Sequence, residues 1–289
     1  MFLDKLNLGG RVAIVTGGGT GLGKATCLTL AQAGADIVVA ARRRHLIEQT
    51  AEEIRELGGR ALAIPTDATK RDQVQRMVEA ALLEFGRIDV LVNNAGGARG
   101  IDVNPVELIR GQRLRKAWDW TDEEWHTSLD ISLTTAFNCS QAVAPHMTQV
   151  RRGNIINFSS GAGMRAIQGN FAYCSAKAGV MGLTKALAGT WARYGIRVNC
   201  IVPGFVPGRE YRSEWPEGEL AKRGRFIPLG RLGEPEEVAN VALFLASDAS
   251  EYITGEVFIC DGGIMAAGYA PTDYAPVITP WGEQRGTGG

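Results

Sequence analysis

Residues 11–23 read RVAIVTGGGTGLG, and this stretch decides the fold. The short run of apolar and β-branched residues at 11–16 is typical of a buried strand. A glycine-rich turn, Thr16–Gly23, follows, and helical spacing begins at Lys24. Small residues in such a turn let the backbone approach a pyrophosphate, and the start of the helix supplies free N–H groups. The stretch therefore predicts a strand, a phosphate-binding turn and a helix in succession.

Segments with strand and helix patterns alternate along the rest of the chain. We predict further strands at 36–41, 61–65, 88–92, 154–158, 197–202 and 257–260. We predict helices at 24–33, 44–57, 71–85, 122–147 with Thr121 as N-cap, 172–194 and 234–246. This alternation indicates a parallel sheet with helices on both faces. We therefore expect an α/β fold with a doubly wound, Rossmann-type parallel sheet in a single domain.

Two segments do not follow the alternation. Residues 97–121 are long for a connection between a strand and a helix, and we interpret them as an insertion. Residues 266–289 carry proline, glycine and aromatic residues without periodicity, and we expect a C-terminal tail there. The predicted domain, 1–265, combines dinucleotide binding and catalysis.

Composition argues against several classes of partner. The 289 residues contain 31 lysines and arginines and 31 aspartates and glutamates, so the formal net charge is zero. Such a balance favours neither nucleic acid nor a membrane surface as the main partner. The histidines and the five scattered cysteines lack the spacing of metal ligands, so no metal site is expected. The odd number of cysteines fits a reducing compartment, and we predict a cytoplasmic protein.

Further motifs follow the glycine-rich turn, whose spacing is T-G-x-x-x-G-x-G. They are Asn93–Gly96 (NNAG), Ser160, Tyr173–Lys177 (YCSAK), Pro203–Gly204 and Asp261–Gly263 (DGG). With these motifs in this order on the expected elements, residues 8–263 resemble the short-chain dehydrogenase/reductase family. The resemblance implies a nicotinamide cofactor and a small carbonyl or alcohol substrate. It also implies a homo-oligomer, either a tetramer or a dimer.

The resemblance assigns cofactor contacts to particular residues. Asp67 and Ala68 would contact the adenine, and Asn94–Gly96 would flank the adenosine ribose. The whole expected set is Gly17, Gly19, Thr20, Gly21, Leu22, Gly23, Arg42, Arg43, Asp67, Ala68, Asn94, Ala95, Gly96, Tyr173, Lys177, Pro203, Gly204 and Val206.

The end of the second predicted strand indicates which nicotinamide cofactor is used. NAD-preferring sites place an acidic residue there to bind the adenosine ribose. This chain has Ala41 at the corresponding position, and Arg42 follows directly. A guanidinium suits a 2′-phosphate, so we predict NADP(H). The alternative is that Arg42–Arg44 form only a solvated helix start, and then NAD remains open.

The catalytic prediction rests on Tyr173 and Lys177, which share one face of a helix because four residues separate them. A carbonyl that accepts hydride needs a proton, and a phenol with a pKa of about 10 releases it poorly near neutrality. A nearby ammonium lowers that pKa. By resemblance, Lys177 also holds the nicotinamide ribose, and Ser160 hydrogen-bonds the substrate oxygen, with Ser159 as the competing candidate.

One position departs from the family pattern. Many members carry asparagine in a segment like D-V-N-L, but residues 130–133 read DISL here, so Ser132 occupies that position. In the family the asparagine supports a water chain from the lysine to solvent. The dienoyl- and enoyl-CoA reductase branch includes members with other residues there, and often has a similar glycine-rich turn. Its dienoyl members usually lack the tyrosine that Tyr173 provides.

Three functions are therefore weighed. Transfer of hydride between NADP(H) and a secondary alcohol or ketone comes first, and reduction of a C=C bond comes second. A cofactor-binding regulator without turnover is the alternative from another class.

By resemblance, residues 205–225 form the loop that covers the substrate. Aromatic side chains in it would give an apolar lining, and its arginines either meet an anionic substrate or face solvent. The residues concerned are Phe205, Tyr211, Trp215, Arg209, Arg212 and Arg223.

Overall fold

The computed structural model describes residues 3–96, 116–167, 169–208, 212 and 215–267. In this part of the chain, seven parallel strands form one sheet in the order β3-β2-β1-β4-β5-β6-β7. The strands are β1 Val12–Thr16, β2 Asp36–Ala41, β3 Ala61–Pro65, β4 Val90–Asn93, β5 Gly153–Phe158, β6 Ile196–Pro203 and β7 Val257–Cys260. The predicted doubly wound α/β fold is confirmed.

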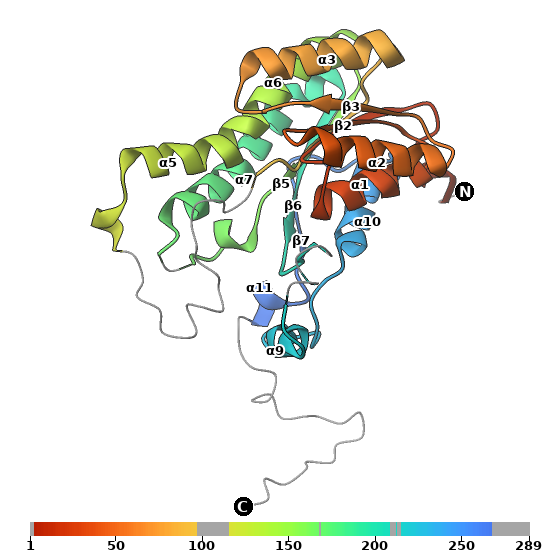
Figure 1. Cartoon of the computed structure of the whole chain (residues 1–289). Coiled ribbons are helices and arrows are strands. Elements are labelled where there is room, and N and C mark those ends of the chain that lie inside the picture. Colours follow the sequence, from red (N-terminus) through yellow and green to blue (C-terminus); the bar gives the residue numbers. More distant parts are fainter. Residues whose placement is uncertain (1–2, 97–115, 168, 209–211, 213–214, 268–289) are drawn as a thin grey trace, which may run out of the picture.

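Helices cover both faces of the sheet (Figure 1). On one face lie α1 (Gly21–Gln32), α2 (Arg44–Glu56) and α10 (Pro235–Ala246), and on the other lie α3 (Arg71–Phe85), α6 (Thr135–Gln149) and α7 (Phe171–Trp191). The remaining α-helices in the described residues are α5 (Asp122–Leu129), α9 (Glu219–Gly224) and α11 (Ile264–Ala267).

The two faces bury separate hydrophobic cores because successive side chains of a strand point to opposite faces. Ala13 and Val15 pack into the core beneath α1, α2 and α10, whereas Val12 and Ile14 pack into the core beneath α3, α6 and α7. All of β1 is buried, which explains its continuous apolar sequence. The sheet is therefore packed against helices on both faces.

The order of the strands creates a switch point. The chain runs outward from β1 through β2 to β3, and then returns to β4 on the other side of β1. The connections on either side of this point lead away from each other, which leaves room for a ligand at the carboxyl ends of β1 and β4. The glycine-rich turn and the Asn93–Gly96 segment both lie there.

Several boundaries of the predicted elements differ from the observed ones by one to three residues, and three differences have a visible structural cause. Helix α1 starts at Gly21 rather than Lys24, because the amide of Lys24 already donates to the carbonyl of Thr20. Strand β4 starts at Val90 rather than Ile88, whose N–H donates to Nε2 of His146 at 3.1 Å.

The third difference lies in the predicted helix 122–147. A π-helical turn, Asp130–Thr134, separates α5 from α6, and Ser132 lies within that turn. Thr121 is the N-cap of α5 and forms a capping box with Glu124, as expected. Such π-helical turns are frequent at functional sites.

Most of the predicted insertion at 97–121 and of the tail at 266–289 lies outside the described residues. In the described part of the chain, no helix is both long enough and apolar enough to cross a membrane.

Candidate active site

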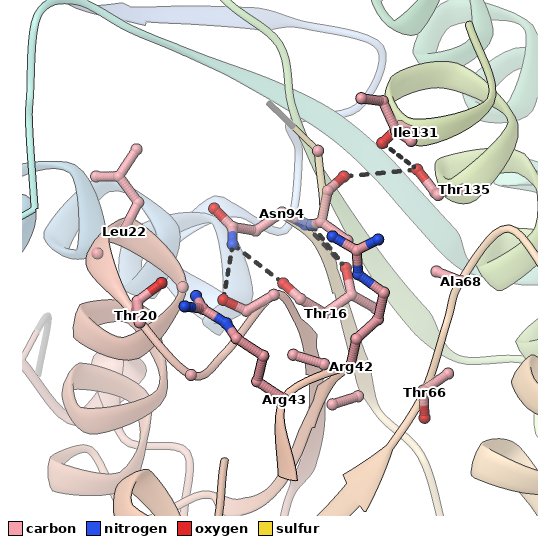
Figure 2. A pocket seen from close by; sticks show the side chains of 18 of the residues that line it. Thr16, Thr20, Leu22, Arg42, Arg43, Thr66, Ala68, Asn94, Ile131 and Thr135 are labelled. Atoms are coloured by element: carbon pink, nitrogen blue, oxygen red, sulfur yellow. Dashed lines mark hydrogen bonds between the residues drawn. The ribbon is translucent and has the colours of Figure 1, made fainter. Parts of the chain in front are cut away.

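The glycine-rich turn is locked against the end of β4. The side-chain amide of Asn94 donates to the carbonyl of Thr16 at 3.1 Å and to that of Gly17 at 3.4 Å. In return, Oγ1 of Thr16 accepts from the backbone N–H groups of Asn94 at 3.1 Å and Ala95 at 3.0 Å. Figure 2 shows these bonds at the base of the pocket. Two strands that are distant in sequence are thereby joined where a ligand would lie.

Position 23 requires glycine because the start of α1 lies very close to the backbone of Gly17. A Cβ atom there would lie 2.2 Å from the carbonyl oxygen of Gly17 and 2.5 Å from Nδ2 of Asn94. The first turn of α1 can therefore pack against the preceding turn only without a side chain. The same packing leaves backbone N–H groups of the helix start available for a phosphate.

A cavity of about 940 Å³ opens over this turn. Ligand pockets are typically about 300–1,000 Å³, so the volume suits a dinucleotide. The expected cofactor residues that line it are Gly17, Gly19, Thr20, Gly21, Leu22, Gly23, Arg42, Arg43, Asp67, Ala68, Asn94, Ala95, Gly96 and Val206. The cavity lining does not include the other four, Tyr173, Lys177, Pro203 and Gly204.

Arg42 and Arg43 are exposed and extend over the cavity beside Ala41, the last residue of β2 (Figure 2). Arg44 instead pairs with Glu48 at 3.2 Å, on the surface of α2. The carboxylate of Asp67 accepts hydrogen bonds from the backbone and the hydroxyl of Thr69. The end of β2 therefore presents cations and no carboxylate to the cavity.

Ser160, Tyr173 and Lys177 come together at the carboxyl end of β5. Ser160 follows this strand, and its hydroxyl caps the next turn by accepting from the N–H of Ala162 at 3.2 Å. The hydroxyl of Ser160 is near enough to the Tyr173 phenol to lower the pKa of the phenol. The ammonium of Lys177 donates to the carbonyl of Phe158 at 2.9 Å and lies 5.8 Å from the centre of the Tyr173 ring.

Burial dominates the ionisation of this pair. It raises the pKa of Tyr173 above its usual value, and the hydroxyl of Ser160 opposes that rise in part. Burial also lowers the pKa of Lys177 to about 8, because the lysine side chain is almost entirely shielded from solvent. The two pKa values move apart, so burial favours the neutral phenol and the neutral amine over a phenolate beside an ammonium.

The two adjacent serines have different environments. The hydroxyl of Ser159 is buried and donates to the backbone carbonyl of Lys177 at 2.7 Å. That bond fixes α7 to the end of β5. Ser160, by contrast, lies near Tyr173 and lowers the pKa of its phenol. The structure thus brings Ser160 to the tyrosine and engages Ser159 in the packing of the helix.

Ser132 lies close to the same place and has an unused hydroxyl. The side chain is 2% exposed, and its oxygen has no hydrogen-bond partner among the residues that the structure describes. Gly96 lies between its backbone and Lys177: a Cβ atom on Gly96 would be 3.4 Å from Nζ of Lys177 and 3.7 Å from Cα of Ser132. The glycine therefore leaves space between the two side chains.

Known proteins share this arrangement over nearly the whole chain. A protein-family model described as enoyl-(acyl carrier protein) reductase matches residues 17–265. A 3-oxoacyl-[acyl-carrier-protein] reductase, FabG, of Thermotoga maritima is 38% identical over 260 residues, which cover 90% of this chain and all of that protein. The chain belongs to the short-chain dehydrogenase/reductase family.

Solved structures of this family have the same fold. A short-chain type dehydrogenase/reductase from Mycobacterium marinum superposes with a TM-score of 0.78 at 37% identity, covering 92% of this chain and 99% of that one. A 7α-hydroxysteroid dehydrogenase, solved with NADH and a 7-oxo bile acid, superposes with a TM-score of 0.80 at 31% identity, covering 90% and 96%.

These relatives decide between the three functions. The named reductase and the hydroxysteroid dehydrogenase act at C–OH and C=O groups, and the chain is an oxidoreductase of this kind that depends on a nicotinamide cofactor. The prediction of hydride transfer between a nicotinamide cofactor and an alcohol or ketone is confirmed, and neither C=C reduction nor a role as a regulator without turnover is favoured.

Sequence reasoning missed a buried polar network in this short-chain dehydrogenase/reductase. The side-chain amide of Asn93 donates to the side-chain oxygen of Asn157 at 2.9 Å, and Asn157 donates to the hydroxyl of Thr184 at 2.9 Å. Asn157 and Thr184 are fully buried. The network joins β4, β5 and α7. Its residue on α7, Thr184, lies seven residues after Lys177. Asn157 within an otherwise largely apolar strand was the sequence feature that could have revealed this network.

The arginines of the 205–225 loop contact groups of the protein itself. Arg212 pairs with Glu234 at 2.6 Å. Arg223 pairs with Glu219 at 2.9 Å, and its guanidinium lies 4.2 Å from the centre of the Trp215 ring. Neither side chain faces solvent, and both charges are already balanced. Arg209 and Tyr211 lie outside the described residues.

Proposed function

We propose that the chain is an NADP(H)-dependent ketoreductase in which Tyr173 exchanges the proton with the substrate oxygen. The observation that carries the proposal is the cluster at the end of β5, where the ammonium of the buried Lys177 lies 5.8 Å from the centre of the Tyr173 ring and Ser160 is beside the phenol. A phenol, a hydroxyl and an ammonium that converge at the edge of a dinucleotide cavity are suited to a reaction at a carbonyl.

Each side chain has a distinct role. The hydroxyl of Ser160 donates a hydrogen bond to the substrate oxygen, which stabilises the negative charge that develops on it during reduction. The hydroxyl of Tyr173 gives its proton to the same oxygen, and in the oxidative direction takes it back. The ammonium of Lys177 favours the ionised form of Tyr173, which lies within reach of its charge.

The residues present suit a nicotinamide dinucleotide. When bound, it supplies or accepts the hydride. The turn at 17–23 holds the pyrophosphate, and Lys177, whose Nζ lies close to Gly96, holds the nicotinamide ribose. Asp67 and Ala68 contact the adenine, and Asn94–Gly96 contact the adenosine ribose. Pro203 at the end of β6, with Gly204 and Val206 after it, lies at the nicotinamide end.

The preference for NADP(H) rests on the end of β2. Arg42 and Arg43 extend over the cavity, and Ala41 stands where a carboxylate would repel a phosphate. A guanidinium binds the 2′-phosphate through charge-assisted hydrogen bonds. One relative was solved with NADH, so membership of the family does not by itself determine which cofactor is used. The proposed preference for NADP(H) therefore rests on residues of this chain.

Ser132 completes the proton path. Its buried hydroxyl lacks a partner among the described residues, and the space at Gly96 separates it from Lys177. A serine side chain is shorter than the usual asparagine and so leaves room for a water in that space. Such a water would accept hydrogen bonds from both Ser132 and Lys177. The proton lost by Tyr173 is then restored through Lys177 and this water.

The remaining properties of the protein follow the same family pattern. The catalytic domain spans 1–265 with the insertion at 97–121 and the substrate loop at 205–225, and 266–289 form a tail. The protein is cytoplasmic, since five free cysteines include three that are fully buried as thiols. It is a homotetramer or a homodimer, and exposed apolar side chains on α5 and α6, Trp125 and Phe137, support an interface between copies.

A screen of NADPH oxidation over ketones, 3-oxoacyl thioesters and enoyl thioesters tests the proposal. We expect turnover of a ketone or 3-oxoacyl substrate and little turnover of enoyl substrates. Binding of NADPH without any turnover would support the regulator instead.

Arg42→Ala tests the cofactor preference in the same assay. The NADPH/NADH ratio of kcat/KM should fall by about tenfold or more, since the variant loses a charge-assisted bond to the 2′-phosphate. Arg44→Ala, which removes a surface ion pair on α2, is the matched control and should leave the ratio unchanged. A wild-type preference for NADH would refute the NADP(H) assignment.

A further inference from the structure

Arg212 is fixed in place although it belongs to the loop that follows β6. Its guanidinium makes three contacts: Nε donates to the carbonyl of Pro207 at 3.1 Å, one terminal nitrogen donates to the carbonyl of Gly233, and the other pairs with Glu234 at 2.6 Å. The side chain is only 15% exposed. Three directed bonds from one planar group define a single geometry for the atoms around it.

The partners of Arg212 belong to two separate segments. Pro207 lies between Val206 and Gly208, and these three residues form one wall of the 940 Å³ cavity. Gly233 and Glu234 lie just before the first turn of α10, which packs against β5 and β6. Arg212 therefore joins a wall of the cofactor cavity to a helix in the body of the protein.

The two segments also touch directly. The N–H of Gly233 donates to the carbonyl of Phe205 at 3.2 Å, and a Cβ atom on Gly233 would lie 2.7 Å from a methyl group of Val206. This close approach brings the carbonyls of Pro207 and Gly233 within reach of one guanidinium. The hydrogen bonds of Arg212 thus add to the direct backbone contact between the two segments.

We propose that Arg212 is a positioning residue for the cofactor, which acts by holding the wall formed by residues 206–208 in its binding conformation. It lies behind the wall and does not itself line the cavity. Without it, the segment gains conformational freedom, and binding must restrict that freedom again. The inference rests on the proposed function only in requiring that the cavity holds a nicotinamide nucleotide.

The charges around Arg212 support a positioning role rather than recognition of a substrate anion. Glu234 neutralises the guanidinium, and its three contacts occupy most of its donors. A substrate anion would have to displace a carboxylate at 2.6 Å. The expected effect of losing Arg212 is therefore on cofactor affinity and not on the chemical step.

The test compares three variants of the full-length enzyme. Arg212→Met keeps the length of the side chain and removes all three contacts. Arg212→Lys keeps the charge but cannot reproduce the planar set of three bonds. Arg231→Met is the matched control, because Arg231 pairs with Glu237 at the same end of α10 but is exposed and makes no recorded contact with Pro207. For each variant, the Kd of NADPH and of NADH is measured by fluorescence titration, and kcat is measured at saturating cofactor.

For Arg212→Met we expect the Kd of both nucleotides to rise by about tenfold, the equivalent of one charge-assisted hydrogen bond. The kcat at saturation should stay within about twofold of wild type, as should both quantities for Arg231→Met. Arg212→Lys should give an intermediate Kd.

Two results would overturn the proposal: a Kd within about twofold of wild type for Arg212→Met, or a loss of kcat at unchanged Kd. If Arg212→Met does not fold, Arg212→Lys decides in the same way. A wild type that prefers NADH would refute the NADP(H) assignment, but the variant-to-wild-type ratio for NADH would still test Arg212.

Discussion

Lys177 lies in an environment very different from that of a free side chain in water. Its ammonium is 4% exposed and has one recorded hydrogen-bond acceptor, the carbonyl of Phe158, among the described residues. Burial therefore favours the neutral amine and lowers its pKa from 10.5 to about 8. In the reaction this makes the charge of Lys177 sensitive to pH near neutrality.

The affinity for NADPH should consequently depend on pH. The ammonium that holds the ribose is present below pH 8 and is lost as the pH rises through about 8, so the Kd should increase above that pH. The burial-raised pKa of Tyr173 keeps the phenol neutral over the same window. Fluorescence titration between about pH 7 and 9.5 measures the effect. A Kd that stays constant across this range would show that Lys177 does not hold the cofactor as an ammonium.

Ser132 provides a second test at the scale of one residue. Ser132→Ala should lower kcat by about fivefold to tenfold, because one hydrogen bond to the relay water is lost, and should leave the Kd of NADPH unchanged. Ser132→Asn should retain activity, since an amide can serve the same position. Steady-state kinetics at several pH values decide the matter. Equal kcat for Ser132→Ala and wild type would remove Ser132 from the proton path.

At the scale of elements, the site depends on how strands and helices are fastened to one another. Thr16 and Asn94 join the ends of β1 and β4, whereas Ser159 and Asn157 join β5 to α7. Each fastening uses short side chains that bond to backbone or to each other in a buried place, where such bonds are strong and expensive to leave unmade. The helix that carries Tyr173 is thus held against the end of β5, the strand that Ser160 follows.

Gly23→Ala tests the packing of the phosphate-binding turn. The new Cβ atom would lie 2.2 Å from the carbonyl oxygen of Gly17, so the turn must move. We expect a destabilisation of about 1–3 kcal/mol and a large loss of NADPH affinity. Gly189→Ala in α7 is the control, because its Cβ would meet open space, and alanine there should stabilise the helix by about 0.5–1 kcal/mol. Thermal unfolding and nucleotide titration report both effects. Normal NADPH binding by Gly23→Ala would contradict the assigned turn.

At the scale of the whole molecule, the outer face of α7 favours self-association. Small residues, Ala178, Gly182 and Ala186, recur along the exposed side of the helix. They would let a second copy approach closely. Light scattering coupled to gel filtration should give the mass of a dimer or tetramer, and Ala186→Arg should reduce it. A monomeric wild type at micromolar concentration would refute the oligomer.

Much of this molecule could be predicted from its sequence, because local patterns report local structure. Strands β2 and β7 and helix α3 have the predicted bounds, since each is a clear periodic run between turn residues. The π-helical turn at Ser132 could not be foreseen, because one extra residue in a helix barely alters its periodicity.

Contacts between distant segments were also hidden. The partner of Arg212, Glu234, is determined by tertiary packing, whereas Arg223 pairs with Glu219 one turn earlier on α9. The sequence therefore left open whether these arginines bind a substrate or face solvent, and the structure gives a third answer. Motif order, in contrast, placed Ser160, Tyr173 and Lys177 near each other because parallel strands end at one edge of the sheet.

Tyr173→Phe tests the central claim most directly. The variant keeps the aromatic ring beside Lys177 but lacks the hydroxyl that exchanges a proton with the substrate. NADPH titration and steady-state turnover are measured on the same preparation, with a ketone that the wild type reduces. We predict an NADPH Kd within about twofold of wild type and a kcat lowered by about a hundredfold or more. Turnover near the wild-type rate would show that Tyr173 is not the acid/base and would contradict the account.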